Sequence, residues 1–334
     1  GYEYGSFHFL EPSFLHNYTD STAGFIGSHV VDAYIQEGYE VVVVDILSTG
    51  TLLNVHPKAK FYQVDIRSKE LNRVFDEERP DIVNHHAAQK SVPKSWEDPM
   101  LDADINILGL MNILQLSVEY KVQRIIFASS GGALSGNALS YPTSEQAFPS
   151  FQSPYAITKY ISEKYIHLYA EIHRTTYVIL RYANVYGARQ IAEGECGVIP
   201  VFLHNLLTGQ PSTLYTYDDM PRGTLRDYVY VKDVAKANVL ALTEGQQTIV
   251  HIGSGQGVYT ADLYELLQTV TGISLPLMID KERQGDIKYS LLDCSKAYEE
   301  LGWKPQTGLL EGLTQTVEYL FSGPREKEKQ ATAN

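Results

Sequence analysis

The stretch "GFIGSHVVDAYIQEGYEVVVVD", residues 24–45, decides which fold the sequence predicts. Its first two glycines, Gly24 and Gly27, precede a helical pattern of apolar residues. Four consecutive valines then predict a buried strand, which ends in Asp45. A glycine loop, a helix and a strand that ends in a carboxylate make up most of a dinucleotide-binding βαβ unit.

The start of this unit departs from the G-x-x-G-x-x-G pattern. Ser21 occupies the place of the first glycine, and the preceding run "LHNYTD" is a poor sequence for a buried strand. We still expect a strand at about residues 15–19, and we expect Gly24 and Gly27 to lie against a pyrophosphate at the helix N-terminus. Keeping the tight turn with a serine costs on the order of one to a few kcal/mol.

Asp45 indicates which dinucleotide this unit binds. At the end of the second strand, its carboxylate can accept hydrogen bonds from both hydroxyls of an adenosine ribose, which favours NAD over NADP. Two glycines before a helix are by themselves equally typical of a simple tight turn. The acidic residue at this spacing makes a cofactor site the better interpretation.

Composition limits the classes of function. The chain has 334 residues, 44% of them hydrophobic and 20% charged, as in ordinary globular enzymes. Its net charge of −13 disfavours a broad surface for nucleic acid or for an anionic membrane. Cys196 and Cys294 form no metal-binding pattern with histidines, so we expect no metal site and a reducing, cytoplasmic location. We find no apolar run of about 18 residues and no signal-peptide pattern, and we expect no membrane span.

Farther along the chain, strand and helix patterns alternate, which predicts a Rossmann-type, doubly wound parallel sheet of the α/β class. Strands are expected at 41–44, 61–64, 82–84, 124–128 and 177–181, and helices at 25–37, 68–78, 100–119 and 154–173. After Tyr182, glycines and prolines become frequent, which indicates a smaller, irregular C-terminal domain for substrate binding.

The predicted domain limits follow from this change of pattern. We assign 14–185 to the NAD-binding domain, 186–224 and 248–322 to a substrate-binding domain, and 1–13 and 323–334 to tails. A strand–helix unit at about 225–247 is expected to return to the main sheet.

The run "SPYAITK", residues 153–159, carries the strongest indication of chemistry. Tyr155 and Lys159 are four residues apart and share one face of a helix, for which Ser153 is the expected N-cap. An ammonium near a phenol lowers the tyrosine pKa and makes the phenol a general base. Most such pairs lie on solvated helix faces, but this one follows a dinucleotide unit. Ser129 and Ser130 also end a predicted strand, at the edge where α/β sheets bind ligands.

Together these residues resemble those of the extended short-chain dehydrogenases/reductases, and most closely the UDP-hexose 4-epimerases. The other matching runs are "VDIRS", "HHAAQKSV", "FASSGGA", "LRYANVYG", "RDYVYVKDVA", "ERQGD" and "LGWKP". The resemblance implies an isomerase that interconverts UDP-glucose and UDP-galactose. In that reaction bound NAD takes hydride from C4, the 4-keto sugar rotates, and hydride returns to its other face. The family also implies a homodimer built from the helices at 100–119 and 154–173.

The resemblance assigns roles to individual residues. Tyr155 is similar to the catalytic base, Lys159 to its electrostatic partner and Ser130 to the third catalytic group, with Ser129 as the second choice. Cofactor contacts are implied for Gly24, Phe25, Ile26, Gly27, Asp45, Leu47, Ser48, Asp65, Ile66, Ala87, Ala88, Lys90, Asn106, Ser129, Tyr155, Lys159 and Tyr182. UDP-sugar contacts are implied for Lys90, Ser130, Tyr155, Asn184, Gly197, Val198, Tyr215, Arg226, Arg283, Asp286 and Ser290.

Related activities on the same scaffold differ in a few residues. Sugar-nucleotide 4,6-dehydratases need an acidic pair after the catalytic serine, where this chain has Gly131 and Gly132. UDP-glucuronate decarboxylases usually place a glutamate in this loop, and none occurs before Leu134. An epimerase of UDP-N-acetylhexosamines or UDP-uronates stays open, because Ser290 is small where a bulky residue narrows the family's sugar pocket. A non-catalytic NAD-sensing regulator is disfavoured by the Tyr/Lys pair.

Overall fold

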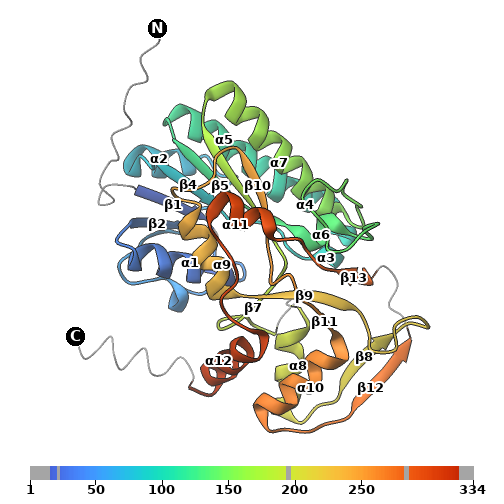
Figure 1. Cartoon of the computed structure of the whole chain (residues 1–334). Helices are drawn as coiled ribbons and strands as arrows, with labels where there is room; N and C mark the ends of the chain where they lie inside the picture. Colours follow the sequence, from blue (N-terminus) through green and yellow to red (C-terminus); the bar gives the residue numbers. More distant parts are fainter. Residues whose placement is uncertain (1–15, 21–22, 193–196, 282–285, 323–334) are drawn as a thin grey trace.

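The computed structural model describes residues 16–20, 23–192, 197–281 and 286–322. Within these ranges, seven parallel strands form the main sheet, in the order β10-β6-β5-β4-β1-β2-β3 (Figure 1). The strands are β1 (His16–Asp20), β2 (Glu40–Val44), β3 (Lys60–Tyr62), β4 (Ile82–His85), β5 (Arg124–Ser130), β6 (Thr176–Tyr182) and β10 (Thr248–Ile252). Strands β1 to β6 lie in the order β3-β2-β1-β4-β5-β6, which is the strand order of the doubly wound dinucleotide-binding fold. This order confirms the predicted fold class.

The polar run before the glycine loop forms the expected strand. β1 pairs with β2 on one side and with β4 on the other, so that Thr19 lies opposite both Val43 and Asn84. A central strand needs backbone groups that bond on both sides, and these are available whatever the side chains are. Ser21 and Thr22, which replace motif glycines, lie outside the described residues.

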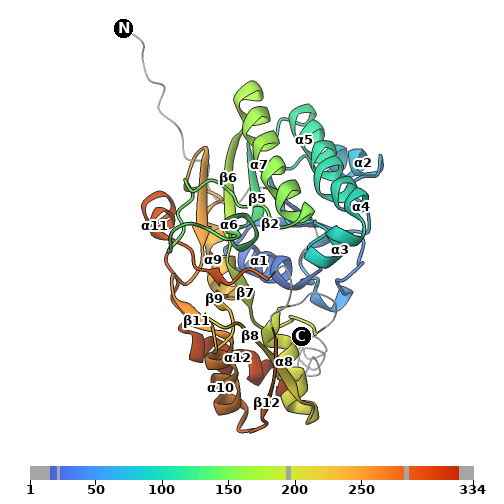
Figure 2. The same ribbon diagram turned by 90° about the vertical axis from the view of Figure 1, so that its right-hand side faces the viewer.

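Helices cover both faces of the main sheet (Figures 1 and 2). One face is covered by α1 (Phe25–Gln36), α9 (Val231–Leu240) and α11 (Ser295–Leu301), and the other by α2 (Leu71–Glu78), α5 (Gly109–Glu119) and α7 (Pro154–His173). Alternate valines of β2 face opposite layers: Val41 and Val43 pack with α1, whereas Val42 and Val44 pack with α2. This burial on both sides explains the run of four valines.

Two predicted elements differ in detail. β3 ends at Tyr62, because the Tyr62 carbonyl accepts hydrogen bonds from the amides of both Asp45 and Val64. The single helix expected at 100–119 is divided into α4 (Pro99–Ala103), a π-helical turn (Asp104–Leu108) and α5. A π-turn inserts an extra residue into the helical ladder and is frequent at functional sites.

The run Pro99–Glu119 is also long and apolar enough, by length and composition, to cross a membrane. The sequence analysis expected no such run. In the structure its residues Leu110, Ile113 and Leu114 are fully buried against the main sheet. The run is therefore a core helix of the layer that contains α2 and α7.

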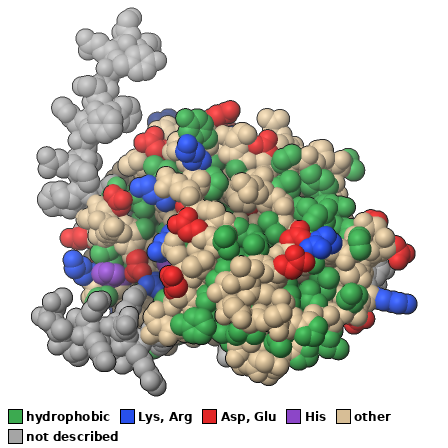
Figure 3. All heavy atoms as spheres, turned by 60° about the horizontal axis from the view of Figure 1, so that its bottom comes forward, with side chains coloured by type: hydrophobic (Ala, Val, Ile, Leu, Met, Phe, Trp, Pro, Cys, Tyr) green, Lys and Arg blue, Asp and Glu red, His purple; other side chains and the backbone are tan. Residues whose placement is uncertain are grey.

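A second, smaller part follows the carboxyl end of β6. Its elements are β7 (Asn184–Tyr186), β9 (Leu225–Tyr230), β11 (Gly257–Tyr259), β13 (Tyr289–Ser290), a two-stranded sheet of β8 (Ser212–Thr216) and β12 (Leu277–Lys281), and helices α8 (Val198–Thr208), α10 (Thr260–Thr271) and α12 (Leu309–Ser322). It has its own core, in which Phe202 and Tyr264 meet edge to face. Figure 3 shows acidic and basic side chains interspersed on the face that this part presents.

The expectation that the strand at 225–230 returns to the main sheet is wrong. β9 pairs with β7, β11 and β13, and only the following helix, α9, packs against α1 of the large layer. The seventh strand is instead β10, which the sequence analysis placed in the smaller domain and which pairs with β6 through Leu180 and Val250. Both segments are short, and β9 includes the charged Arg226 and Asp227, so periodicity alone does not tell which sheet such a strand joins.

His29 ties α1 to the loop after β7. Its ring Nε2 lies 2.9 Å from the Ala188 carbonyl oxygen, to which a neutral ring can donate. Burial, and next the nearby Arg189 guanidinium, lower the pKa of His29 from 6.5 to about 4. The folded protein keeps this ring neutral, whereas the unfolded chain binds a proton as the pH falls below about 6.5. The contribution of the neutral His29 ring to the free energy of unfolding is therefore complete above about pH 6.5 and is lost as the pH falls toward 4.

We expect His29 to contribute about 2 kcal/mol to the loss of unfolding free energy between about pH 7.5 and pH 5. Denaturant titrations at the two pH values measure this loss. His29→Gln can still donate to the Ala188 carbonyl but does not titrate, so its loss should be smaller by that amount. The same pH dependence in both proteins would contradict the assignment.

Candidate active site

The predicted site residues gather at the carboxyl edge of the main sheet. Asp45 directly follows β2, Asp65 follows β3, Ala87 follows β4, and Ser130 is the last residue of β5. Because the strands are parallel, these ends meet at one edge, on both sides of the switch point between β1 and β4.

An open cleft with an empty volume of about 460 Å³ lies at this edge. Its lining includes six residues with an implied cofactor contact, namely Asp45, Ser48, Asp65, Ile66, Ala87 and Ala88. Apolar walls with a few convergent polar groups are typical of small-molecule sites. The lining therefore fits the adenosine half of a dinucleotide.

Asp45 is fixed between two loops. Its Oδ2 accepts a hydrogen bond from the Ala23 amide at 2.9 Å, and its Oδ1 accepts one from the Leu47 amide at 2.7 Å. The side chain is nearly fully buried. A carboxylate has about four acceptor positions, so these two bonds are compatible with ribose hydroxyls as further donors.

The first turn of α1 supplies donors at the same edge. Gly24 is the N-cap in extended conformation, and among the described residues no side chain caps the helix. Phe25, Ile26 and Gly27 follow it, and the first amides of a helix have no partner within the helix. They are suited to an anionic group such as a pyrophosphate.

Arg67 is a member of this cleft that the sequence analysis missed. Its guanidinium bonds the Asp65 carboxylate at 2.5–3.2 Å and the Asp104 carboxylate at 2.5 Å. The hydrogen bonds from Arg67 lower the pKa of Asp65. Arg67 thus joins the loop after β3 to the π-turn across one wall of the cleft.

Helix α7 positions the Tyr/Lys pair. The Ser153 hydroxyl caps it, as predicted, by accepting from the Ala156 amide at 3.1 Å, and Pro154 occupies the first turn. Lys159 is almost fully buried, and its Nζ donates to the Ala128 carbonyl of β5 at 2.9 Å. The same ammonium lies 4.7 Å from the centre of the Phe127 ring and 6.0 Å from that of Tyr155. The pair therefore stands beside the end of β5.

The two serines at the end of β5 have different surroundings. The Ser129 hydroxyl is buried and donates to Glu163 of α7 at 2.6 Å. The Ser130 hydroxyl lies at the strand end, where it accepts from the Ala133 amide at 3.3 Å and caps α6 (Gly131–Ser135). This geometry favours Ser130 over Ser129 as the third catalytic group beside Tyr155 and Lys159.

Asn106 links the loop after β4 to helix α7. It lies in the π-turn, where its side-chain oxygen accepts from the Gln89 amide at 2.8 Å and its nitrogen donates to the Gln89 carbonyl at 3.0 Å. Asp102 accepts from the Asn106, Gln89 and Thr158 side chains at 2.8–3.1 Å. Thr158 precedes Lys159, so this buried cluster connects the loop after β4 with α7.

Tyr182 is held by polar side chains at the end of β6. Its hydroxyl accepts from the Asn238 amide group at 2.9 Å and lies 3.1 Å from His86 Nε2. Burial raises the pKa of Tyr182 far above its usual value, so it stays protonated. The ring of His85 stacks on that of Phe127, and the ring of His86 stacks on that of Tyr182.

Most of the implied substrate residues lie in the smaller part, whereas Lys90, Ser130 and Tyr155 belong to the large part. Arg226 on β9 donates to the carbonyls of Leu225 and Lys288, and burial lowers its pKa. Asp286 accepts from the Tyr217 hydroxyl at 3.0 Å and is one of the charges that act on Arg226. No sequence motif had indicated Tyr217.

The other implied substrate residues lie on several different elements. Asn184 begins β7, Gly197 caps α8 in a left-handed conformation (φ +83°), and Val198 starts that helix. Tyr215 on β8 and Lys90 after β4 are exposed. Ser290 pairs with Arg226 in the register of β13 and β9, whereas Arg283 lies outside the described residues.

A comparison with protein families decides where the chain belongs. A model described as the NAD dependent epimerase/dehydratase family matches residues 22–253, well over half of the chain. The chain belongs to this family. The resemblance seen in the sequence is thereby confirmed.

Members of the epimerase family with known names are similar over nearly the whole chain. A UDP-glucose 4-epimerase of Mycolicibacterium smegmatis is 35% identical, with 89% of this chain and 96% of that protein covered. The Thermotoga maritima UDP-glucose 4-epimerase, solved with UDP-glucose, is 42% identical with a TM-score of 0.89, covering 92% of this chain and 99% of that one. The Thermus thermophilus UDP-glucose 4-epimerase, solved with NAD, is 38% identical with a TM-score of 0.86, covering 92% and 100%.

Proposed function

We propose that this chain is a UDP-glucose 4-epimerase, an isomerase that interconverts UDP-glucose and UDP-galactose with bound NAD. The observation that carries the proposal is the buried Lys159 beside Tyr155 and the end of β5, at the same sheet edge as the cleft lined by Asp45, Asp65 and Ala87. Similarity to named epimerases over about nine-tenths of the chain supports it.

The cofactor site is proposed from the residues around the cleft. Asp45 would bind the ribose hydroxyls, and Asp65 and Ile66 would bind the adenine edge. The first turn of α1 would bind the pyrophosphate, while Ala87, Lys90 and Tyr182 would lie toward the nicotinamide side. Bound NAD would accept the hydride from C4 and return it to the opposite face of the sugar.

Tyr155 is the proposed proton acceptor and donor. Its phenolate would take the proton of the 4-hydroxyl and later return a proton to the 4-keto oxygen. Lys159 is buried and keeps its ammonium within 6.0 Å of the Tyr155 ring centre, so its charge stabilises the phenolate. Ser130 would donate a hydrogen bond to the same substrate oxygen.

In the proposed site, one group of residues would bind the nucleotide and a different group would surround the sugar. Arg226 and Asp286, together with Arg283, would bind the diphosphate and ribose of UDP. On the sugar side, a methyl group added to Gly132 would lie 3.2 Å from the Ser290 hydroxyl and 4.0 Å from the Asn184 side-chain oxygen. Among the described residues the buried Ser290 hydroxyl has no hydrogen-bond partner, as expected of a group that faces a polar ligand.

We propose that the protein is a homodimer and acts in the cytoplasm. Exposed apolar residues cover the outer side of α4, the π-turn and α7: Met100, Leu108, Ile157, Leu168 and Ile172. These elements contact one another, so the residues lie on one side of the molecule. An apolar face of this kind is typical of a subunit interface.

Removal of the Tyr155 hydroxyl tests the function directly. Tyr155→Phe should lower the kcat for UDP-galactose by about 10²–10⁴-fold while the protein keeps its NAD. A coupled assay for UDP-glucose measures turnover, and the bound nicotinamide is measured after denaturation. Tyr160→Phe, on the same helix, is the matched control and should retain activity. Near-normal turnover by Tyr155→Phe would overturn the catalytic assignment, and no turnover by the parent protein would overturn the proposed function.

Ser290 tests the size of the sugar pocket. Ser290→Tyr fills the space beside Gly132 and Asn184, so it should abolish any turnover of UDP-N-acetylglucosamine and spare that of UDP-glucose. The ratio of the two kcat/KM values measures the change. An unchanged ratio would show that Ser290 does not line the sugar pocket.

Charges on the apolar face test the homodimer. The double variant Leu168→Glu/Ile172→Glu should sediment with the mass of one 37.4 kDa chain, whereas the parent sediments with twice that mass. Leu320→Glu on α12 adds a charge to another exposed apolar position and should leave the dimer intact. A parent protein that sediments as a monomer would contradict the proposal.

A further inference from the structure

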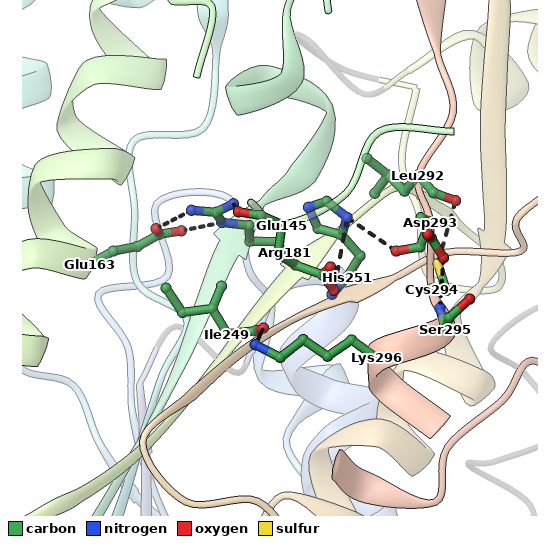
Figure 4. Close-up of polar contacts among 10 residues, drawn as sticks. All are labelled: Glu145, Glu163, Arg181, Ile249, His251, Leu292, Asp293, Cys294, Ser295 and Lys296. Atoms are coloured by element: carbon green, nitrogen blue, oxygen red, sulfur yellow. Dashed lines mark hydrogen bonds and ion pairs between the residues drawn. The ribbon is translucent and has the colours of Figure 1, made fainter. Parts of the chain in front are cut away.

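The most deeply buried Arg–Glu ion pair in the described residues joins the proposed catalytic helix α7 to β6. Glu163 of α7 and Arg181 of β6 are almost fully buried and form two hydrogen bonds of 2.8 and 2.6 Å (Figure 4). A buried ion pair is in general no more stabilising than apolar residues of the same size. Its presence here therefore calls for another explanation.

The Glu163 carboxylate also holds the end of β5. The Ser129 hydroxyl donates to Glu163 Oε1, the oxygen that also accepts from Arg181 Nε. One helical turn earlier, Lys159 donates to the carbonyl of Ala128. Two residues of one face of α7 thus hold two consecutive residues of β5, directly before Ser130.

This contact determines where Ser130 lies. Successive side chains of a strand point to opposite faces of the sheet. Because the Ser129 side chain points toward α7, the Ser130 side chain points to the other face. There the Ser130 hydroxyl caps α6. Release of Ser129 would let the strand end rotate and would move Ser130 relative to Tyr155.

Arg181 extends the same network into the loop that precedes α7. Its Nη1 donates to the Glu145 carbonyl at 3.4 Å, and the Glu145 carboxylate accepts from the His251 amide of β10 at 2.7 Å. Figure 4 shows Arg181 between Glu163 on one side and Glu145 and His251 on the other. The chain between Ser130 and Tyr155 is therefore anchored to the same guanidinium.

We propose that the Glu163–Arg181 pair, acting through the Ser129 hydroxyl, is a positioning element that sets Ser130 against Tyr155 and Lys159. The inference rests on the proposed function, because it concerns the same catalytic site. The resemblance implied a cofactor contact for Ser129, but its hydroxyl donates to Glu163. Glu163, Arg181 and Ser129 are therefore positioning residues, since none of them is placed at the reacting atoms.

Ser129→Ala is the decisive variant, because it leaves the ion pair in place. We expect its kcat for UDP-galactose to fall about 10–100-fold, the size of effect produced by a displacement of about 1 Å in a catalytic group. The KM and the bound NAD should stay as in the parent. The inflections of the pH–rate profile should also stay, since Tyr155 and Lys159 are unchanged. Ser129→Thr keeps the hydroxyl that donates to Glu163, so its kcat should be close to that of the parent.

Two further variants separate positioning from stability. Glu163→Gln loses the charge and should lose at least as much kcat as Ser129→Ala. Ser117→Ala removes an equally buried hydroxyl on α5, at a residue that makes none of the site contacts described above, and should keep kcat within about twofold of the parent. If Glu163→Gln does not fold, the two Ser129 variants decide.

Two results would overturn the inference. The first is a kcat of Ser129→Ala within about twofold of the parent, and the second is a loss that appears in KM or in NAD content instead of kcat. A parent protein without turnover would overturn the proposed function and this inference together. An active parent with equally active variants would overturn this inference alone.

Discussion

A parallel sheet of this kind is stable only when helices cover both of its faces. In this protein that requirement shapes the core: Val41 and Val43 face α1, while Val42 and Val44 face α2. The same requirement shapes the site. Helical crossovers bring every strand of the main sheet back in the same direction, so the loops after β2, β3 and β4 and the end of β5 meet at one edge.

Hydrogen bonds between buried polar groups fix the positions of the proposed site residues at this edge. Lys159 donates to a backbone carbonyl of β5, Glu163 binds both Arg181 and Ser129, and Asn106 binds both polar groups of the Gln89 backbone. Each group would be costly to bury without its partners, so each contact is made with a defined geometry. The catalytic helix α7 is consequently tied to the cofactor loop on one side and to β5 on the other.

The local patterns predicted the large sheet well and the C-terminal half less well. The βαβ unit at residues 24–45 predicted the doubly wound fold, and even the polar β1 is formed as expected. The strand at 225–230 was assigned to the wrong sheet, because β9 and β10 are both short strands whose sequence pattern does not tell which sheet each joins. The π-turn at Asp104–Leu108 was missed for a related reason. An extra residue in a helical ladder leaves no mark on a pattern that is read over several turns.

The sequence by itself determined the family, the cofactor unit and the Tyr155–Lys159 pair, because each depends on residues close together in the chain. Spacing of four residues places two side chains on one helical face whatever the rest of the protein does. Only the tertiary structure decided that Ser130 caps α6 while Ser129 donates to Glu163. The same is true of the contact between Arg67 and Asp104 across the cleft wall and of the hydrogen bond from Tyr217 to Asp286. Those contacts join residues from separate elements, and their partners are set by how the layers pack.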